Sequence, residues 1–328
     1  MNTSAKDTGD AIDVSVIIAA WSAASFIERA IASALSSTGV RVEVIVVDDA
    51  SPDNTFEIAR QIAKTDGRVT ADRLPANSGP SVARNRAIAL AHGRYVAVLD
   101  ADDAMAPGRL ATLVTLADRT CADIAVDNML DVADAGAPAG AAPFLKSDPY
   151  TRSRYIDLAT WIRRNQPMQP GDCLGYLKPL IRRATFAHTK LGYDPSLRNS
   201  EDYYLVANLL AAGARMIYTP EAGYYYQRSA GSASHRLQPS QTKAWLDAEK
   251  RFVDSYRDKA TAEEKSALMA RGRVLRGVDQ FVAVVDAMKA GRIGRFLGLL
   301  AADPGASPYT LGTLARIAMG KVLRRKLV

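Results

Sequence analysis

The sequence predicts an α/β fold, in which a mixed, largely parallel sheet is flanked by helices and followed by a helical C-terminal extension. Two apolar runs, VSVIIAA at 14–20 and VEVIVVDD at 42–49, and the segment RYVAVLDADD at 94–103 lack the alternation of half-exposed strands. Such runs are typical of strands buried on both faces. Helical spacing of apolar residues fills the gaps between them, and this alternation indicates a doubly wound sheet.

The helices expected between the strands follow in order. Phe26 and Ala30 begin one pattern, and Phe56 begins a second after the potential caps Ser51 and Asp53. A third pattern begins near Pro80, a favourable residue in a first helical turn, and runs to a glycine stop at 93.

The second half of the chain has a different pattern. Residues 131–143 are rich in Gly, Pro and Ala and are expected to form a loop, and residues 171–186 a loop followed by a strand or short helix. A short helix at 199–213 and a strand with a turn at 215–228 come next, and the chain is mainly helical from 240 onward.

The length of 328 residues suggests one large domain or two moderate ones. We expect an extended or disordered segment at 1–12, a main domain at 13–238 and a helical region with a basic tail at 239–328. The main domain is expected to have two halves, 13–106 and 107–238.

The charge is modestly basic, since 42 Lys and Arg against 35 Asp and Glu give +7. This excess suits a phosphate-bearing ligand or an anionic membrane, but the charge is not gathered with aromatic residues as in a nucleic-acid-binding module. The two cysteines form no CxxC pair, which leaves a zinc ribbon or redox motif unsupported. Both are expected to be buried or half-buried thiols in a reducing compartment.

The N-terminal residues lack the pattern of a signal peptide, and no apolar run reaches the roughly 18 residues of a membrane span. We expect a cytoplasmic protein that can be peripheral on the inner face of the plasma membrane. The tail at 304–328 has five cations and no acid. It could form a basic amphipathic helix on an anionic membrane, or pack as a solvated tail on its own domain.

Acidic residues follow two of the predicted strands. Asp48 and Asp49 end one, and Asp100, Asp102 and Asp103 end another. Ligands of open α/β sheets bind beyond the carboxyl ends of the strands, where a divalent cation would neutralise such a cluster. The D-x-D pattern of Asp100 and Asp102 indicates a magnesium or manganese site, although Asp102 or Asp103 could instead cap a helix beginning near Pro107.

The first strand end excludes one class of site. It reads AAWSAASFI, without the G-x-G-x-x-G of a dinucleotide-binding fold or a glycine-rich basic loop. Trp21 could line a base-binding pocket or pack against the protein. In NSGPSVARNRA, Arg84 and Arg86 could reach a base or a pyrophosphate, or form a solvated helix face.

Two later motifs admit two explanations each. Glu201 and Asp202 lie in a first helical turn, where acids are favourable for the helix dipole, but a carboxylate here could also be a general base. His235 lies in a Gly- and Ser-rich stretch and could be surface or a late metal ligand.

The order of these motifs resembles the family 2 glycosyltransferases, inverting enzymes of the nucleotide-diphospho-sugar (GT-A) fold. The likeness extends from about Asp13 to Leu237. It includes VSVIIAAWSAASFIERAIASAL, VEVIVVDDASPDNT, NSGPSVARNRAIALAHGRYVAVLDADD and SEDYYLVANLLAAGARMIYTPEAGYYYQRSAGSAS. The resemblance implies a nucleotide-sugar half at 13–106 and an acceptor half at 107–238. The later region is most similar to bacterial exopolysaccharide enzymes of the succinoglycan type.

The resemblance implies roles for individual residues. Asp102 would bind Mn²⁺ or Mg²⁺ on the donor diphosphate, with Asp100 at the ribose or metal. Asp202 would be the catalytic base with Glu201 beside it, and His235 a further metal ligand. The remaining nucleotide-sugar candidates are Ala20, Trp21, Asp48, Asn77, Asp49, Arg84 and Ala101, and candidates for an acceptor or phosphate contact are Lys178 and Arg228.

The implied reaction is transfer of a hexose, with glucose from UDP-glucose the first expectation, to a hydroxyl of a lipid-linked oligosaccharide in exopolysaccharide biosynthesis. QRSAGS stands where processive synthases have a Gln/Arg-x-x-Arg-Trp motif, which favours addition of one sugar. The first strand also departs from the family's usual Pro and Asn-containing turn.

Two alternatives remain, a sugar nucleotidyltransferase and a non-catalytic sugar- or partner-binding module. Pyrophosphate release would reveal the first, and absence of donor turnover the second. The oligomeric state is open, with a homodimer among the alternatives.

Overall fold

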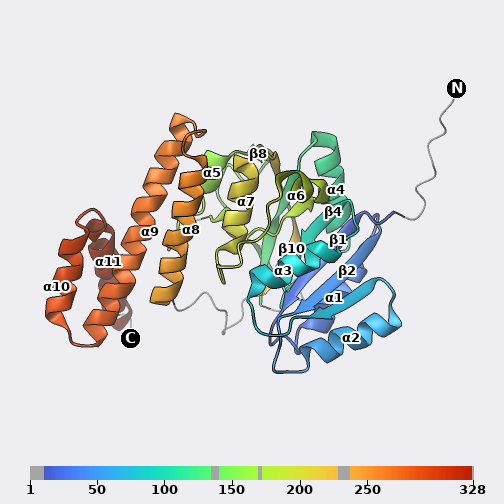
Figure 1. The fold of residues 1–328 in the computed structure, drawn as a ribbon, viewed down its shortest axis with the longest axis horizontal. Coiled ribbons are helices and arrows are strands. Elements are labelled where there is room, and N and C mark those ends of the chain that lie inside the picture. The colour runs from blue at the N-terminus through green and yellow to red at the C-terminus, as the bar shows by residue number, and fades with distance from the viewer. Residues whose placement is uncertain (1–10, 134–139, 169–171, 228–236, 327–328) are drawn as a thin grey trace. The chain divides into compact units, whose positions relative to one another are not determined.

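The computed structural model describes residues 11–133, 140–168, 172–227 and 237–326, with side chains of the last helix to 316. The chain divides into two compact units (Figure 1). Unit 1 contains residues 1–157 and 176–230, and unit 2 contains residues 158–175 and 231–328.

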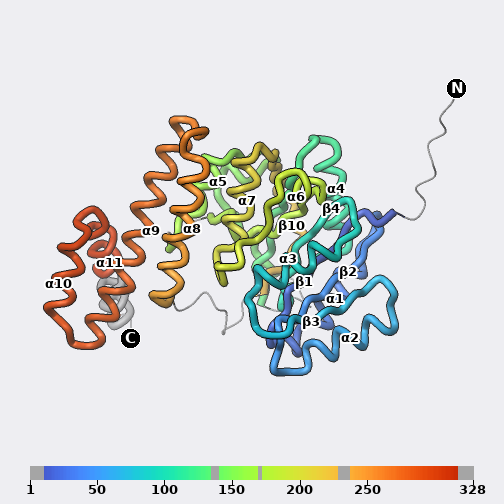
Figure 2. Tube along the Cα trace, in the orientation of Figure 1, coloured from blue at the N-terminus to red at the C-terminus, as the bar shows by residue number. Residues whose placement is uncertain are grey.

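The first half of unit 1 is the predicted alternation of strands and helices, which can be followed along the blue and cyan tube in Figure 2. The parallel strands β1, β2, β3 and β4 lie in the order β3-β2-β1-β4. The strands β1 and β2 are buried along nearly their whole length, which explains their unbroken apolar sequence. Their bounds are β1 Val14–Ala20, β2 Val42–Asp48, β3 Val69–Arg73 and β4 Tyr95–Val98.

The three predicted helices are present as α1 (Ile27–Leu35), α2 (Thr55–Thr65) and α3 (Pro80–Leu90). Helix α3 ends at Leu90, before the predicted stop at Gly93. Gly93 has a different reason to be glycine, because a Cβ there would lie 2.6 Å from the backbone nitrogen of Ser15 in β1.

The sheet continues from β4 through β9, β6 and β10 to β5, and it becomes mixed because β9 is antiparallel to β4 and β6. β7 pairs with β6, and β8 with β10. The bounds are β5 Ala104–Met105, β6 Ile124–Val132, β7 Ala142–Pro143, β8 Arg154–Ile156, β9 Leu180–Arg182 and β10 Met216–Gln227. The helices of this half are α4 Arg109–Thr120, α6 Arg183–Thr189 and α7 Glu201–Ala211. The predicted α/β fold with a mixed sheet and flanking helices is confirmed.

Two local predictions in this half were wrong. The segment predicted as a loop from 131 contains the end of β6 and, at 142–143, β7. The turn predicted within 215–228 does not interrupt β10, which runs to Gln227, because shifts in register between Thr219 and Tyr224 let the strand continue beside β6.

Gly223 is the glycine that the continuation of β10 requires. A Cβ at this position would lie 2.8 Å from the Cβ and Cγ of Arg109. The buried Arg109 guanidinium forms an ion pair with Asp127 at 2.8 Å, and the Gly223 amide donates to the same carboxylate.

Unit 2 is helical in its described residues. Helix α9 (Ala262–Lys289) packs against four other helices, α5, α8, α10 and α11. Their bounds are α5 Leu158–Arg163, α8 Pro239–Tyr256, α10 Ile293–Ala302 and α11 Ser307–Lys326, and a short helical turn, Leu174–Tyr176, ends the α5 segment. The buried Arg271 of α9 pairs with Glu249 of α8 at 3.0 Å and thereby joins two helices.

No helix in the described ranges is long and apolar enough to cross a membrane. Cys121 is exposed rather than buried, since it ends α4 in a left-handed conformation, and Cys173 is half-buried as expected.

Candidate active site

The acidic turn after β4 is held by β10. The buried Tyr224 accepts a hydrogen bond from the Asp100 amide at 3.0 Å and donates one to Asp103 at 2.7 Å. The Gln227 amide donates to the other Asp103 oxygen at 2.8 Å. Asp103 is therefore a buried acceptor that fixes the turn. Neither Asp102 nor Asp103 caps a helix, because α4 begins two elements later at Arg109 without a side-chain cap.

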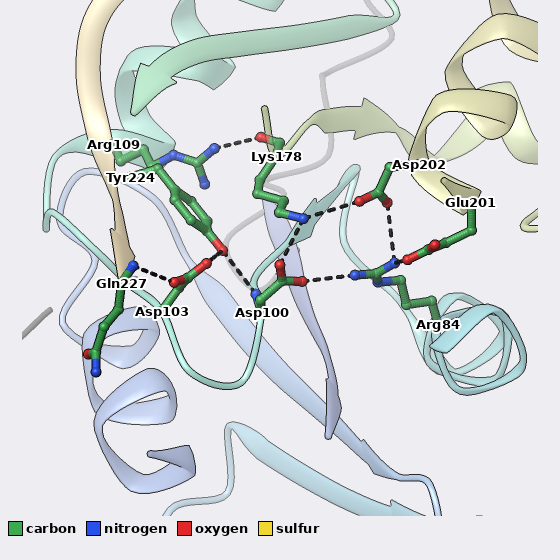
Figure 3. A network of polar contacts seen from close by, with 9 residues as sticks. All are labelled: Arg84, Asp100, Asp103, Arg109, Lys178, Glu201, Asp202, Tyr224 and Gln227. Carbon is green, nitrogen blue, oxygen red and sulfur yellow. Dashed lines mark hydrogen bonds and ion pairs between the residues drawn. The ribbon is translucent and has the colours of Figure 1, made fainter. Parts of the chain in front are cut away.

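Two cations connect this turn to the start of α7 (Figure 3). The Lys178 ammonium lies 2.8 Å from Asp100 and 3.1 Å from Asp202. The Arg84 guanidinium lies 2.8 Å from Asp100, 2.6 Å from Glu201 and 3.3 Å from Asp202. We call Arg84, Asp100, Lys178, Glu201 and Asp202 the ionic network.

Each member of the network is placed by a different element. Asp100 follows β4, Arg84 lies in α3, and Glu201 and Asp202 are the first residues of α7. Lys178 precedes β9, and its carbonyl accepts a hydrogen bond of 2.6 Å from the buried Arg109. The network thus joins segments from both sequence ranges of unit 1, 1–157 and 176–230, and these contacts give the carboxylates a fixed arrangement.

Burial and charge oppose one another in the network. Burial raises the pKa of Asp100, but the adjacent Lys178 and Arg84 outweigh it and lower that pKa to about 2. Burial lowers the pKa of Lys178, but Asp100 and Asp202 raise it above its ordinary value. Asp100 and Lys178 are therefore charged at neutral pH, and the Asp100 carboxylate is neutralised by protein cations.

The other two carboxyl groups of the turn behave differently. Burial and the charge of Asp100 raise the pKa of Asp102. Burial, with the charges of Asp100 and Asp102, raises the pKa of Asp103 to about 8. A cation bound beside Asp102 would offset the repulsion among these neighbouring carboxyl groups and favour their ionised forms.

Asp102 fits a divalent cation better than its neighbours do. It is half-buried, and its carboxylate takes part in no ion pair of the described residues, whereas Asp100 has two. Magnesium usually takes one or two carboxylates, with water and substrate phosphates completing its shell. Within the described ranges, no three His, Cys, Asp or Glu side chains form a ready metal cluster. The residues present therefore fit a cation shared with a ligand.

The other nucleotide-sugar candidates lie at the ends of β1 and β2. Both oxygens of Asp49 accept backbone hydrogen bonds from Ser78 and Gly79, at 2.6 and 2.8 Å. The buried Asp48 pairs with Arg73 at 3.2 Å. Asn77 is exposed and donates to the Asp49 carbonyl. These contacts fix the loop before α3, and a base contact by these residues stays a prediction.

Ala20 and Ala101 are buried, whereas Trp21, directly after β1, has 57% of its surface exposed. Trp21 is thus not a packing aromatic. Arg86 pairs with Asp72 on the exposed face of α3 and does not join the network. His235 and Arg228 lie outside the described residues.

Two residues that contact the site, Arg29 and Tyr193, were not predicted from the sequence. Arg29 of α1 donates to the Asp102 carbonyl at 2.7 Å and to the Gln227 side chain at 2.5 Å. The Arg84 guanidinium lies over the Tyr193 ring, with its central carbon 5.2 Å from the ring centroid. Burial and the nearby Asp202 raise the pKa of Tyr193. The roles of Arg29 and Tyr193 are recognisable only from their positions in space.

The sequence and fold are similar to those of known proteins. The family model for glycosyl transferase family 2 matches residues 15–184, just over half of the chain. Succinoglycan biosynthesis proteins ExoO and ExoU of Rhizobium meliloti are 36% and 34% identical to it. The first alignment covers 90% of this chain and 82% of ExoO, and the second 92% and 86% of ExoU.

Two solved structures show the same fold. S. aureus TarS in complex with UDP-GlcNAc has a TM-score of 0.60 at 17% identity, covering 88% of this chain and 90% of that chain. The mannosyltransferase PcManGT of Pyrobaculum calidifontis, in complex with GDP-Man and Mn²⁺, has a TM-score of 0.59 at 20% identity, covering 96% and 83%. Family match, relatives and fold agree: the chain is a glycosyltransferase and belongs to glycosyl transferase family 2.

Proposed function

We propose that this chain is an inverting, non-processive hexosyltransferase that moves one sugar, with UDP-glucose as the first donor to test, to a hydroxyl of a lipid-linked oligosaccharide. The observation that carries the proposal is the ionic network. It joins the acidic turn after β4 to the carboxylates of α7, so that a donor diphosphate at the first and an acceptor hydroxyl at the second would be neighbours.

Asp102 would hold Mn²⁺ or Mg²⁺ together with the donor diphosphate. The cation would neutralise the negative charge that develops on the departing nucleoside diphosphate. Support comes from the half-buried position of Asp102 beside Asp100, where burial and the Asp100 charge raise its pKa, and from its absence from the ion pairs of the described residues. PcManGT, which shares the fold, was solved with GDP-Man and Mn²⁺. Asp100 is paired with Arg84 and Lys178 and would hold these two cations in position within the site.

Asp202 would act as the general base. Its carboxylate accepts the proton of the acceptor hydroxyl while that oxygen bonds to the anomeric carbon of the sugar. The bond between this carbon and the diphosphate oxygen breaks on the opposite face, and the electron pair leaves with the nucleoside diphosphate. One displacement inverts the anomeric centre, and no covalent sugar–enzyme bond is needed.

Arg84 and Lys178 would orient the base. The two oxygens of Asp202 contact different cations, Arg84 at 3.3 Å and Lys178 at 3.1 Å, which fixes the plane of the carboxylate. Glu201 also pairs with Arg84, at 2.6 Å, and would influence the base by holding this guanidinium in position. Lys178 would also lie within reach of a phosphate or acceptor group that enters beside Asp100.

Exopolysaccharide assembly is the proposed context, because ExoO and ExoU are succinoglycan biosynthesis proteins and are similar to this chain over most of its length. A lipid-linked acceptor requires contact with a membrane, here the inner face of the plasma membrane. Unit 2 supplies a suitable surface: Ile293 and Leu297 of α10 are 74% and 58% exposed, and the exposed Arg292 and Arg295 lie beside them. We call this the α10 surface.

The test is release of nucleoside diphosphate from a panel of nucleotide sugars, with Mn²⁺, Mg²⁺ or EDTA. We expect turnover of one donor, its loss in EDTA, and a fall of about 100-fold or more in Asp202→Asn with donor binding retained. Asp247→Asn removes an exposed carboxylate of α8 and is the matched control. Donor turnover that survives in Asp202→Asn would refute the base assignment, and absence of any donor binding would refute the transferase proposal.

A further inference from the structure

Three aromatic rings form a cluster beside the ionic network. The ring centroids of Phe144 and Tyr176 are 5.5 Å apart, those of Phe144 and Tyr226 6.1 Å, and those of Tyr176 and Tyr226 6.4 Å. All three pairs are tilted or edge-on, as aromatic rings prefer. We call these residues the aromatic trio.

The trio is tied to the network by short stretches of backbone. Tyr226 follows Tyr224 by two residues in β10, so both side chains point to the same face of the sheet, the face where Tyr224 contacts Asp103. Tyr176 precedes Lys178 by two residues. The cluster therefore cannot move far from the network without disturbing the residues that hold it.

The trio is an accessible surface, not a part of the core. Tyr176 has 42% of its surface exposed, and Phe144 and Tyr226 are half-buried. Burial and the Asp103 carboxylate raise the pKa of Tyr226, so this hydroxyl lies in the electric field of the acidic turn. Exposed aromatic rings next to convergent polar groups are typical of a ligand site.

Strand order separates the trio from the proposed nucleotide end. Trp21 directly follows β1, whereas Tyr226 lies in β10 and Phe144 follows β7, which pairs with β6. Between β1 and β6 lie β4 and β9, the strands next to Asp100 and Lys178. A donor whose base lies near Trp21 would thus have its reacting end at the network, and the trio lies beyond it.

We propose that the aromatic trio is the binding site for a sugar ring of the acceptor. One face of a pyranose presents C–H groups that stack on an aromatic ring, and its rim presents hydroxyls for polar partners. A ring stacked on Tyr176 would extend a hydroxyl toward Lys178 and the proposed base Asp202. This assignment rests on the proposed function, and it names the acceptor end as saccharide and not lipid.

The experiment measures glycoside binding and donor turnover separately. Saturation-transfer NMR with methyl β-D-glucoside and methyl β-D-galactoside reports binding, and UDP release from UDP-glucose without acceptor reports the donor reaction. The variants are Tyr176→Ala, Tyr176→Phe and Tyr155→Ala, the last being an exposed tyrosine of β8 with 50% exposure. Since Tyr176 is exposed, Tyr176→Ala should remain folded.

We expect a glycoside signal that Tyr176→Ala lowers about tenfold and that Tyr176→Phe and Tyr155→Ala keep, with donor turnover unchanged in all three. No glycoside signal, or one that Tyr176→Ala leaves intact, would overturn the assignment even where UDP is released. Tyr176-dependent binding without UDP release from UDP-glucose would keep the sugar site and reject the proposed donor reaction, so the two failures are distinct.

Discussion

Replacing Lys178 by methionine tests the network most directly. The substitution keeps a long side chain but removes the charge that bridges Asp100 and Asp202, both largely buried. The folded pKa of Asp100 lies near 2, against 3.8 for the free side chain. A pKa lowered by almost two units corresponds to about 2–3 kcal/mol of stability at neutral pH, divided between Lys178 and Arg84.

We therefore expect Lys178→Met to lower the free energy of unfolding by about 2–4 kcal/mol at neutral pH, since it also leaves Asp202 with one cation. The sign of the pH dependence follows from the lowered pKa. Asp100 stabilises the native state above its unfolded pKa near 4, and this contribution is lost as the pH falls toward 2. The difference between variant and parent should thus shrink as the pH falls from about 4 toward 2.

The assay is urea unfolding followed by circular dichroism at about pH 7, 5, 4 and 3, with Lys64→Met as the control. Lys64 is exposed on α2 and takes part in no ion pair of the described residues. A difference below about 0.5 kcal/mol at neutral pH, the size typical of a surface site, would refute the reasoning. So would a difference of constant size across the pH range.

Three further predictions concern other parts of the molecule. Arg84→Lys should lower UDP release about tenfold or more, because an ammonium cannot reproduce the planar fork that reaches three carboxylates, and unchanged kcat would contradict this. Gly93→Ala should lower the free energy of unfolding by about 1–3 kcal/mol, because the added Cβ would meet the backbone of β1. The control Gly67→Ala places its Cβ in open space and should not lower it. Equal melting temperatures of the two variants would count against the packing argument. Ile293→Ser combined with Leu297→Ser should reduce co-sedimentation with phosphatidylglycerol vesicles about tenfold, with neutral vesicles as reference, and undiminished binding would place the membrane contact elsewhere.

The fold could be predicted from sequence because its signals are local. The buried runs of β1 and β2 and the helical spacing of α1 and α2 depend only on near neighbours. The end of α3 and the length of β10 depend on distant contacts. Gly93 is small because it meets β1, and β10 continues past Pro220 because its pairing with β6 tolerates bulges.

The site divides in the same way. Asp100, Asp102, Glu201 and Asp202 lie in short motifs and were identified as candidates before their positions were known. The ion pairs that these carboxylates form could not be predicted. Lys178 and Asp100, for example, are 78 positions apart in sequence and meet only through the antiparallel pairing of β4 with β9. No motif indicates that Asp103, the last acid of the same turn, faces inward to Tyr224.

The segment that contains α5 has a consequence for synthesis of the chain on the ribosome. Helix α5 packs against α9, and its Arg163 pairs with Glu263, 100 positions later. At an elongation rate of about 5–20 residues per second, α5 waits some 5–20 seconds for this partner. Its apolar side chains, among them Trp161, are exposed to chaperones in that interval. A fragment cut after residue 238 would remain in this state permanently, so truncation should yield aggregates instead of a minimal catalytic domain.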